Sequence, residues 1–281
     1  AIARHYPDLV EQENPYLSFL KAVITKQAKL IAAWMHIGFI HGVMNTDNTA
    51  ISGETIDYGP CAFMDIFSIG RVFSSIDHHG RYKFGSQAHA AHWNLTKLAE
   101  SLLPLLNENM DEAVKLAEVA IDGFGNEFHS AWILGMRSKL GLFGKEEEDS
   151  ILVQNLLEWM EKSKTDFTSI FRDLTYGNLS ENKIYKSLDF KKWYALWQAR
   201  LSRNTKPLKS AYSMMRKHNP VIIPYNHHIE EVLSAAENDN MKPFLTLLSA
   251  LENPFTLSSS NEAYRHPPVN PNPNYQTFCG T

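Results

Sequence analysis

Apolar residues recur at helical spacing along most of the chain, and this pattern predicts a mainly α fold. After Asn14 and Pro15, a capping residue followed by proline at the first helical position, apolar side chains return every three or four residues to about Phe39. Gly123 and Gly125 predict a break or kink in one later helix. Periodicity and capping residues predict the other helices over 92–106, 111–140, 151–162, 166–174, 190–201, 227–238 and 241–251.

Three stretches depart from the helical pattern. Residues 40–64 hold two short β-prone pieces around Ser52-Gly53-Glu54, which predicts a tight hairpin. Residues 65–90 show little periodicity and predict a long ordered loop, a kind of segment that is usually functional or disordered. The chain after 252 is rich in proline and asparagine and is not expected to form a packed helix. We therefore expect a helical body over 1–252 and a tail over 253–281.

Composition narrows the classes of protein that fit. With 44% hydrophobic and 21% charged residues, the 281-residue chain has the composition of a globular protein large enough for a real core. The net charge of −4 gives no global electrostatic reason to bind nucleic acid or an anionic membrane, and no long uncharged apolar run predicts a spanning helix. Two cysteines and no recognisable targeting segment favour the reducing cytoplasm. The sequence does not predict an oligomeric state.

The densest polar chemistry lies in residues 41–59, HGVMNTDNTAISGETIDYG. Kinase-like phosphoryl-transfer folds use this order: a loop with a base and an asparagine, a hairpin, then an aspartate close to a glycine. Mg²⁺ prefers carboxylate and amide oxygens, so Asn48 and Asp57 at opposite ends of the predicted hairpin could converge on one Mg²⁺ or Mn²⁺. Gly59 would let the backbone pass close to phosphates.

One position departs from the kinase pattern. The slot of the kinase base, two residues after His41, holds Val43, which cannot accept a proton, so by that motif the chain would be a pseudokinase. Asp47, directly before Asn48, is the nearest acid and could serve as the base if the reacting group sits differently. The competing interpretation is that aspartate, asparagine and glycine gather here only because they form turns.

The chain resembles the selenoprotein O family, a kinase-like family. The resemblance rests on HGVMNTDN, TIDYGP, GRYKFGSQ, HWNLTKLAESLLPLL, NPVIIPYNHHIEEVLSAA and the terminal YQTFCGT, and it covers essentially the whole chain. It implies a protein adenylyltransferase that moves AMP from ATP to Ser, Thr or Tyr hydroxyls of protein substrates, with ATP inverted relative to kinases. It also implies that Asp47 is the catalytic base and that Asn48 and Asp57 hold the metal.

The same resemblance implies that this chain is a kinase-like C-lobe carrying the metal site on a short β-hairpin. The family's Lys–Glu pair and phosphate-binding arginines lie N-terminal to this region, so the N-lobe would be missing and the 281 residues alone inactive. Arg81, in GRYKF, matches the family pattern and would bind the nucleotide or substrate, or anchor the loop. Tyr225 stands where the family usually has arginine.

The family also suggests a redox role for the tail. Eukaryotic relatives carry selenocysteine near the C-terminus, where this chain has Cys279. Cys61 is the only intramolecular partner that could form a disulfide with it. The alternative is that Cys61 is a small buried hydrophobe and Cys279 an exposed thiol.

Two further functions stay open at this point. One is a kinase-like phosphotransferase that moves the γ-phosphate, and the other is a non-catalytic helical interaction module. Labelling from the α-phosphate separates the first from adenylyl transfer. The second predicts that changing Asp47, Asn48 and Asp57 has no effect on the protein's function.

Overall fold

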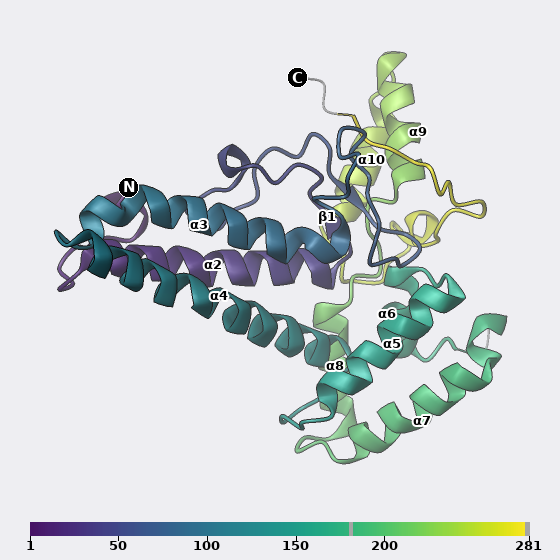
Figure 1. The fold of residues 1–281 in the computed structure, drawn as a ribbon. Helices are drawn as coiled ribbons and strands as arrows, with labels where there is room; N and C mark the ends of the chain where they lie inside the picture. Colours follow the sequence, from purple (N-terminus) through teal and green to yellow (C-terminus); the bar gives the residue numbers. More distant parts are fainter. Residues whose placement is uncertain (180–181, 279–281) are drawn as a thin grey trace.

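The computed structural model describes residues 1–179 and 182–278, and it confirms a mainly helical fold with one small sheet. Figure 1 shows the arrangement of these elements. Among the described residues the α-helices are α1 (Ile2–His5), α2 (Pro15–His36), α3 (Gln87–Leu106), α4 (Met110–Lys139), α5 (Asp149–Ser163), α6 (Phe167–Tyr176), α7 (Leu188–Ser202), α8 (Leu208–His218), α9 (Asn226–Glu237) and α10 (Lys242–Leu251). Short 3₁₀ turns include η2 (Thr46–Asn48) and η3 (Phe84–Ser86), and the strands are β1 (Phe39–Ile40) and β2 (Ala62–Phe63).

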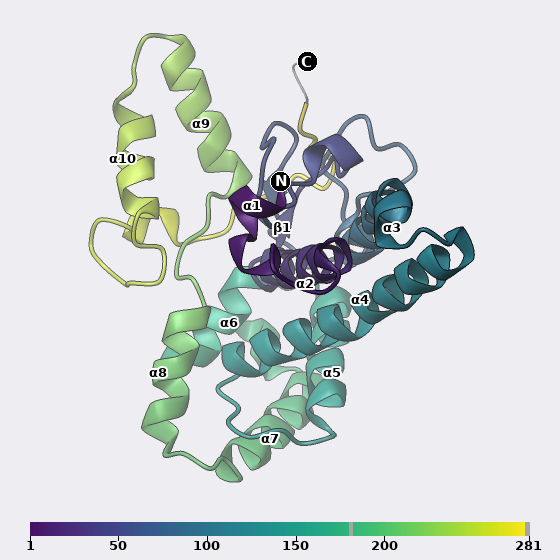
Figure 2. The ribbon, with the colours of Figure 1, turned by 90° about the vertical axis from the view of Figure 1, so that its left-hand side faces the viewer.

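Helices α2, α3 and α4 pack against one another as a bundle, and each of the three contacts the other two (Figures 1 and 2). Asn14 caps α2 as predicted, because its Oδ1 accepts a hydrogen bond from the Leu17 amide at 3.0 Å. Helix α4 runs unbroken through Gly123 and Gly125, so the predicted break is wrong. A side chain at either glycine would meet nothing within 4 Å, and packing of the rest of the helix outweighs their poor helix propensity.

Helices α5 to α8 lie below this bundle in Figure 1, with α5 against α7 and with α8 against α4 and α6. Asp166, which the sequence placed near the start of a helix, caps α6 by accepting a hydrogen bond from the Ser169 amide at 2.7 Å. Helix α7 is capped by Ser187 and begins at Leu188, two residues before the predicted start at 190. Helix α8 was not predicted. Helices α9 and α10 form a hairpin that stands apart from the other helices in Figure 2.

The predicted hairpin around Ser52-Gly53-Glu54 is wrong in position. These residues form a turn, closed by a hydrogen bond from the Gly53 amide to the Ala50 carbonyl, with no flanking strands. The antiparallel ladder lies further out, where Phe39 pairs with Phe63 and Ile40 with Ala62. The strands therefore close the base of a long loop over 41–61 instead of forming its arms.

The tail packs against the body over its described part, without forming an α-helix. The Arg172 side chain donates to the Arg265 carbonyl at 2.5 Å, and the Tyr275 hydroxyl donates to Glu230 at 2.7 Å. Within the described ranges, no helix is both long enough and apolar enough to cross a membrane.

Candidate functional site

The loop over 41–61 leaves the small sheet and returns to it at the same place, which brings its two ends into contact. Gly42 has a φ of +88°, and a side chain there would come within 2.6 Å of the Pro60 carbonyl oxygen. Only glycine allows both the backbone angle and this approach. The His-Gly pair that the sequence singled out is therefore the point where the loop closes.

His41 holds the two halves of this loop together from inside. It is fully buried, and its Nε2 lies 2.8 Å from the Ile56 carbonyl oxygen. Because a carbonyl only accepts, Nε2 carries the proton and donates. Burial lowers the pKa of His41, while the nearby charge of Asp57 acts in the opposite direction. His41 thus fixes the backbone directly before Asp57 and is a positioning residue.

Asp47 and Asn48 lie in the 3₁₀ turn η2, in the first half of the loop. The Asn48 side chain donates to the Val43 carbonyl at 3.1 Å, and the Thr49 hydroxyl donates to the Asn45 carbonyl at 3.1 Å. Val43, which occupies the slot of the kinase base, is buried and supplies only its backbone to this turn. The Asn48 amide oxygen stays available as a ligand because the bond to Val43 uses the nitrogen.

Three buried amide side chains, which sequence reasoning missed, tie the loop to the helices. Gln27 of α2 donates to the Ala50 carbonyl at 2.6 Å. Gln87 at the start of α3 donates to the Phe39 carbonyl and accepts from the His41 amide, both at 3.0 Å. Asn94 of α3 donates to the Met44 carbonyl at 3.0 Å and to the Thr49 hydroxyl at 2.8 Å.

One signal for these ties was present in the sequence. Gln27 falls on the apolar face of its predicted helix, and a polar side chain at a core position needs a buried partner. Its partner, 23 residues away in the chain, could not be identified from the pattern.

Asp57 is exposed and has a φ of +55°, the left-handed conformation that aspartate tolerates better than most residues. Gly59 follows it on the surface, in a turn closed by a hydrogen bond from the Cys61 amide to the Tyr58 carbonyl at 3.4 Å. The left-handed residue of this stretch is therefore Asp57. The carboxylates of Asp47 and Asp57 are exposed, and neither has a hydrogen bond or salt bridge to another described residue.

The donors on this loop fit a hard divalent cation in type. The amide oxygen of Asn48 and the carboxylate of Asp57 are the oxygen ligands that Mg²⁺ or Mn²⁺ prefers. Within 1–179 and 182–278, no three His, Cys, Asp or Glu side chains gather closely enough to hold an ion by themselves. A pair of protein ligands completed by phosphate oxygens is the arrangement that Mg²⁺ commonly takes in nucleotide enzymes.

Arg81 lies on the α3 side of this loop. Its guanidinium is 4.7 Å from the ring centre of Trp93 and 5.7 Å from that of Tyr82. The Tyr82 hydroxyl donates to the Asn45 side chain at 2.6 Å, and the nearby charge of Asp47 contributes to raising the pKa of Tyr82, although burial is the main cause. The structure thus places Arg81 next to the residues that support the Asp47 turn.

The tail reaches the same loop from the opposite end of the chain. The Thr277 hydroxyl donates to the Pro60 carbonyl at 2.6 Å, and the Thr277 amide donates to the Phe73 carbonyl at 2.8 Å. Cys61 is partly buried, and burial raises the pKa of its thiol to about 11, so it is protonated at neutral pH. Cys279 lies outside the described residues, and its pairing with Cys61 stays a prediction.

Tyr225 is a buried hydrogen-bond donor in this chain. Its hydroxyl donates to the carboxylate of Asp166 at 2.9 Å. Burial is the main cause that raises the pKa of Asp166, to about 6. The position where the family usually has arginine therefore supports the start of α6.

Comparison with known proteins gives the family. A family model described as protein adenylyltransferase SelO matches residues 1–252. Two relatives named protein nucleotidyltransferase YdiU, from Bacillus cereus and Bacillus anthracis, are each 51% identical to this chain over all 281 residues. The chain spans 58% of the length of each of these relatives. The chain belongs to the SelO family of protein adenylyltransferases.

Proposed function

We propose that the whole protein transfers AMP from ATP to Ser, Thr or Tyr hydroxyls of other proteins. The observation that carries this proposal is the loop over 41–61. The loop presents two exposed carboxylates without hydrogen-bond partners among the described residues and one amide oxygen, and buried hydrogen bonds hold its backbone in place. Preorganised groups on a rigid support are what a positioning-based transfer reaction requires. The family description supports adenylyl transfer, and the relatives' names support nucleotidyl transfer to protein.

In the proposed reaction Asp47 is the base. The acceptor hydroxyl oxygen bonds to the α-phosphorus of ATP while its proton passes to the Asp47 carboxylate. The bond from the α-phosphorus to the bridging oxygen breaks, and pyrophosphate leaves with that oxygen and its electron pair. The products are a phosphodiester on the acceptor and free pyrophosphate. Exposure of Asp47 lets a large protein acceptor reach it.

Asn48 and Asp57 would hold the divalent cation, Mg²⁺ or Mn²⁺. When bound, the cation neutralises charge on the phosphates. Arg81 adds a permanent positive charge near Tyr82, which supports the turn that carries Asp47. Gly59 carries no side chain that could block the approach of phosphates after Asp57.

We also propose that this chain is the kinase-like C-lobe of that enzyme. The supporting features are the helical body and the order of the loop: His41, then Asp47 and Asn48, then Asp57 and Gly59. Since the cations that grip the triphosphate in the family have no match in this sequence, we expect the 281 residues alone to bind ATP weakly and to be inactive.

The test compares ATP labelled at the α-phosphate with ATP labelled at the γ-phosphate, using the full-length protein, Mg²⁺ and a mixture of acceptor proteins. We expect α-label on protein and release of pyrophosphate. Label from the γ-phosphate alone would show a phosphotransferase and overturn the proposal. Competition by unlabelled UTP, GTP and CTP then identifies the nucleotide, and adenylyl transfer requires that ATP compete best.

A further inference from the structure

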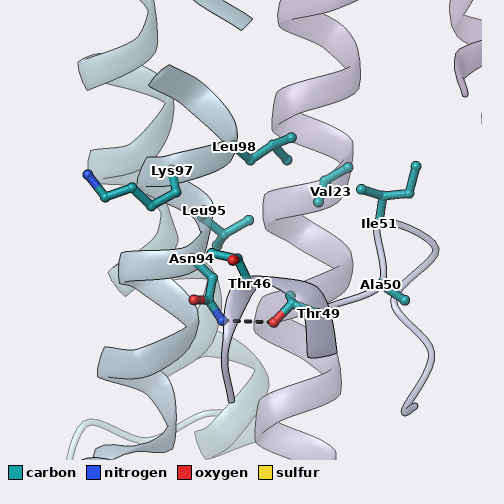
Figure 3. A pocket seen from close by; sticks show the side chains of 9 residues that line it. All are labelled: Val23, Thr46, Thr49, Ala50, Ile51, Asn94, Leu95, Lys97 and Leu98. Carbon is teal, nitrogen blue, oxygen red and sulfur yellow. Dashed lines mark hydrogen bonds between the residues drawn. The ribbon is translucent and has the colours of Figure 1, made fainter. Parts of the chain in front are cut away.

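A pocket of about 320 Å³ opens between α2 and α3, beside the turn that carries Asp47 (Figure 3). Thr46 and Thr49, which flank Asp47 and Asn48 in the chain, form its side toward the turn. The remaining walls are mostly apolar, and they are formed by Val23, Ile51, Leu95 and Leu98. A group held in this pocket therefore contacts the residues next to Asp47, the proposed catalytic base.

Some polar groups of this pocket are engaged with the loop, while the Asn94 amide oxygen is buried without a hydrogen-bond partner among the described residues. The Asn94 amide nitrogen donates to the Met44 carbonyl and to the Thr49 hydroxyl, and Figure 3 shows the second of these bonds. A purine or phosphate needs several donors aimed at it, whereas a compact apolar side chain needs only apolar walls. The pocket thus suits a single apolar side chain.

Two cationic side chains, Lys97 and Arg81, lie close to Trp93 next to the pocket. Lys97 lines the pocket, and its amine extends outward, away from Val23 (Figure 3). Trp93 is 43% exposed, with the Lys97 amine 5.6 Å and the Arg81 guanidinium 4.7 Å from its ring centre. Lys97 pairs with Glu100 at 2.7 Å, but no salt bridge between described residues includes Arg81. Arg81 is thus a cation next to the pocket that an acidic group can reach.

We propose that this pocket and the two cations next to it bind the acceptor protein and set its local sequence. An apolar side chain close to the target hydroxyl enters the pocket, and an acidic side chain nearby pairs with Arg81 and Lys97. This inference rests on the proposed function, because it needs an acceptor whose hydroxyl approaches Asp47. In an extended acceptor each residue advances the chain by about 3.3 Å, so a side chain anchored beside Thr46 keeps a hydroxyl a few residues away next to Asp47.

The test measures transfer from α-labelled ATP to synthetic peptides by the full-length protein. The parent peptide carries one serine, a leucine two positions before it and an aspartate two positions after it. In one derivative alanine replaces the leucine, and in the other lysine replaces the aspartate. We expect each change to raise the peptide KM by about fivefold, the size of one exposed ion pair or a small apolar contact, with little change in kcat.

Two protein variants assign the effects to the pocket. Lys97→Glu should raise the KM of the parent peptide by about fivefold and lower that of the lysine peptide, which is a charge-swap rescue that general damage cannot produce. Leu98→Trp should fill the pocket and remove the difference between the leucine and alanine peptides. Lys115→Glu is the matched control, since Lys115 is also an exposed helix lysine paired with a glutamate three residues away, at 2.8 Å, on α4.

Four outcomes would overturn the inference. The first is an unchanged ranking of the peptides in Lys97→Glu, which is a surface change that should fold even where Leu98→Trp does not. The second is a Leu98→Trp variant that raises the KM of ATP instead of the peptide. The third is labelling of folded proteins but of no peptide, because the pocket is proposed to bind residues near the hydroxyl and a peptide contains these residues too. The fourth is no transfer to protein or peptide, which alone overturns the proposed function as well.

Discussion

The loop over 41–61 and the start of α6 both present aspartate side chains, and the two regions use them in opposite ways. In the loop, Asp47 and Asp57 are exposed and make no hydrogen bond or salt bridge to the other described residues. At α6, Asp166 is half-buried, with its Oδ2 atom buried, and its Oδ1 accepts hydrogen bonds from the Ser169 amide and the Tyr225 hydroxyl. The first arrangement leaves carboxylates available to a ligand, and the second uses one to begin a helix.

The difference follows from which groups satisfy the backbone. In the loop, neutral amides such as Gln27 and Asn94 bind the backbone carbonyls, so the carboxylates are not needed for structure. At α6 the carboxylate itself satisfies an amide at the helix start, with Arg172 close by. A cluster of polar residues is therefore a candidate ligand site when its charged groups have no partners within the protein. It has a structural role when those groups make hydrogen bonds that the fold needs.

The largest effect should come from Asp57. Asp57→Asn in the full-length protein removes the charge but keeps a residue that tolerates a φ of +55°. We expect kcat/KM for transfer to fall by about three orders of magnitude, since a preorganised charge at the phosphates is lost. The temperature of unfolding should change little, because the carboxylate has no partner to lose.

The control for Asp57 is Asp122→Asn, which changes an exposed aspartate on α4. Transfer should stay within twofold in this variant. If Asp57→Asn retained most of the activity, the loop would not be the catalytic centre, and the non-catalytic module would become the better interpretation.

In the region around α6, substitution of the buried Lys139 should produce the largest change in stability. Lys139 is fully buried, with its amine 4.1 Å from the ring centre of Phe171 on α6, and burial lowers its pKa to about 7. The unfolded chain has a lysine pKa near 10.4, so between about pH 7 and pH 10 it binds one proton more than the folded state. Stability should therefore rise with pH across that window.

Lys139→Met removes this titration and keeps an apolar side chain of similar length. We expect the free energy of unfolding at pH 7 to increase by about 3 kcal/mol and its rise with pH to disappear. Denaturant unfolding of wild type and Lys139→Met from pH 7 to pH 10 measures the free energy of unfolding. Lys115→Met is the control, because Lys115 is exposed. Equal pH dependence in wild type and Lys139→Met would contradict the assignment.

The sequence predicts contacts between residues that are close in the chain better than contacts between residues that are far apart in it. The cap at Asn14 involves a partner three residues away and was predicted correctly, and Asp166, predicted to lie near the start of a helix, caps α6 through a partner at the same spacing. Strands β1 and β2 are two residues each and wholly apolar, so they show no alternation, and their pairing spans a 21-residue loop. The hairpin was therefore assigned to the Ser52–Glu54 turn, where local turn residues are strongest.

The candidate site shows the same limit. The residue types and order of Asp47, Asn48 and Asp57 marked the loop in the sequence. The amides that hold it, and the closure between Gly42 and Pro60, depend on contacts between distant parts of the chain, and no local pattern contains them. The role of Tyr225 was also out of reach, since its partner Asp166 lies 59 residues earlier.

A smaller effect is expected at Asp166. Asp166→Ala removes the cap of α6 and leaves the Tyr225 hydroxyl without its acceptor, which should lower the free energy of unfolding by about 2 kcal/mol. Transfer activity should be unchanged at temperatures where the protein stays folded. An equal loss in activity and stability would show that the two regions are coupled.

The pH dependence gives a second measurement on the same residue. The pKa of Asp166 is raised to about 6, so its contribution to stability is complete below about pH 4 and is lost as the pH rises through 6. Asp166→Asn keeps a capping side chain without the titration. The stability of this variant should fall less than that of wild type between pH 4 and pH 6, and identical curves would argue that the carboxyl titrates normally.

The smallest effect separates two buried tyrosines that both bond a polar side chain. Tyr82 donates to Asn45 next to the Asp47 turn, and Tyr185 donates to Asp173 on α6 at 2.7 Å. Tyr82→Phe should lower kcat about fivefold, because the turn loses one support worth about 1 kcal/mol, and should barely change the unfolding temperature. Tyr185→Phe should lower the unfolding temperature and barely change kcat. If both variants lost the same property to the same extent, the site loop and the α6 region would be one cooperative unit, and the availability of Asp47 would depend on the packing of the whole helical body.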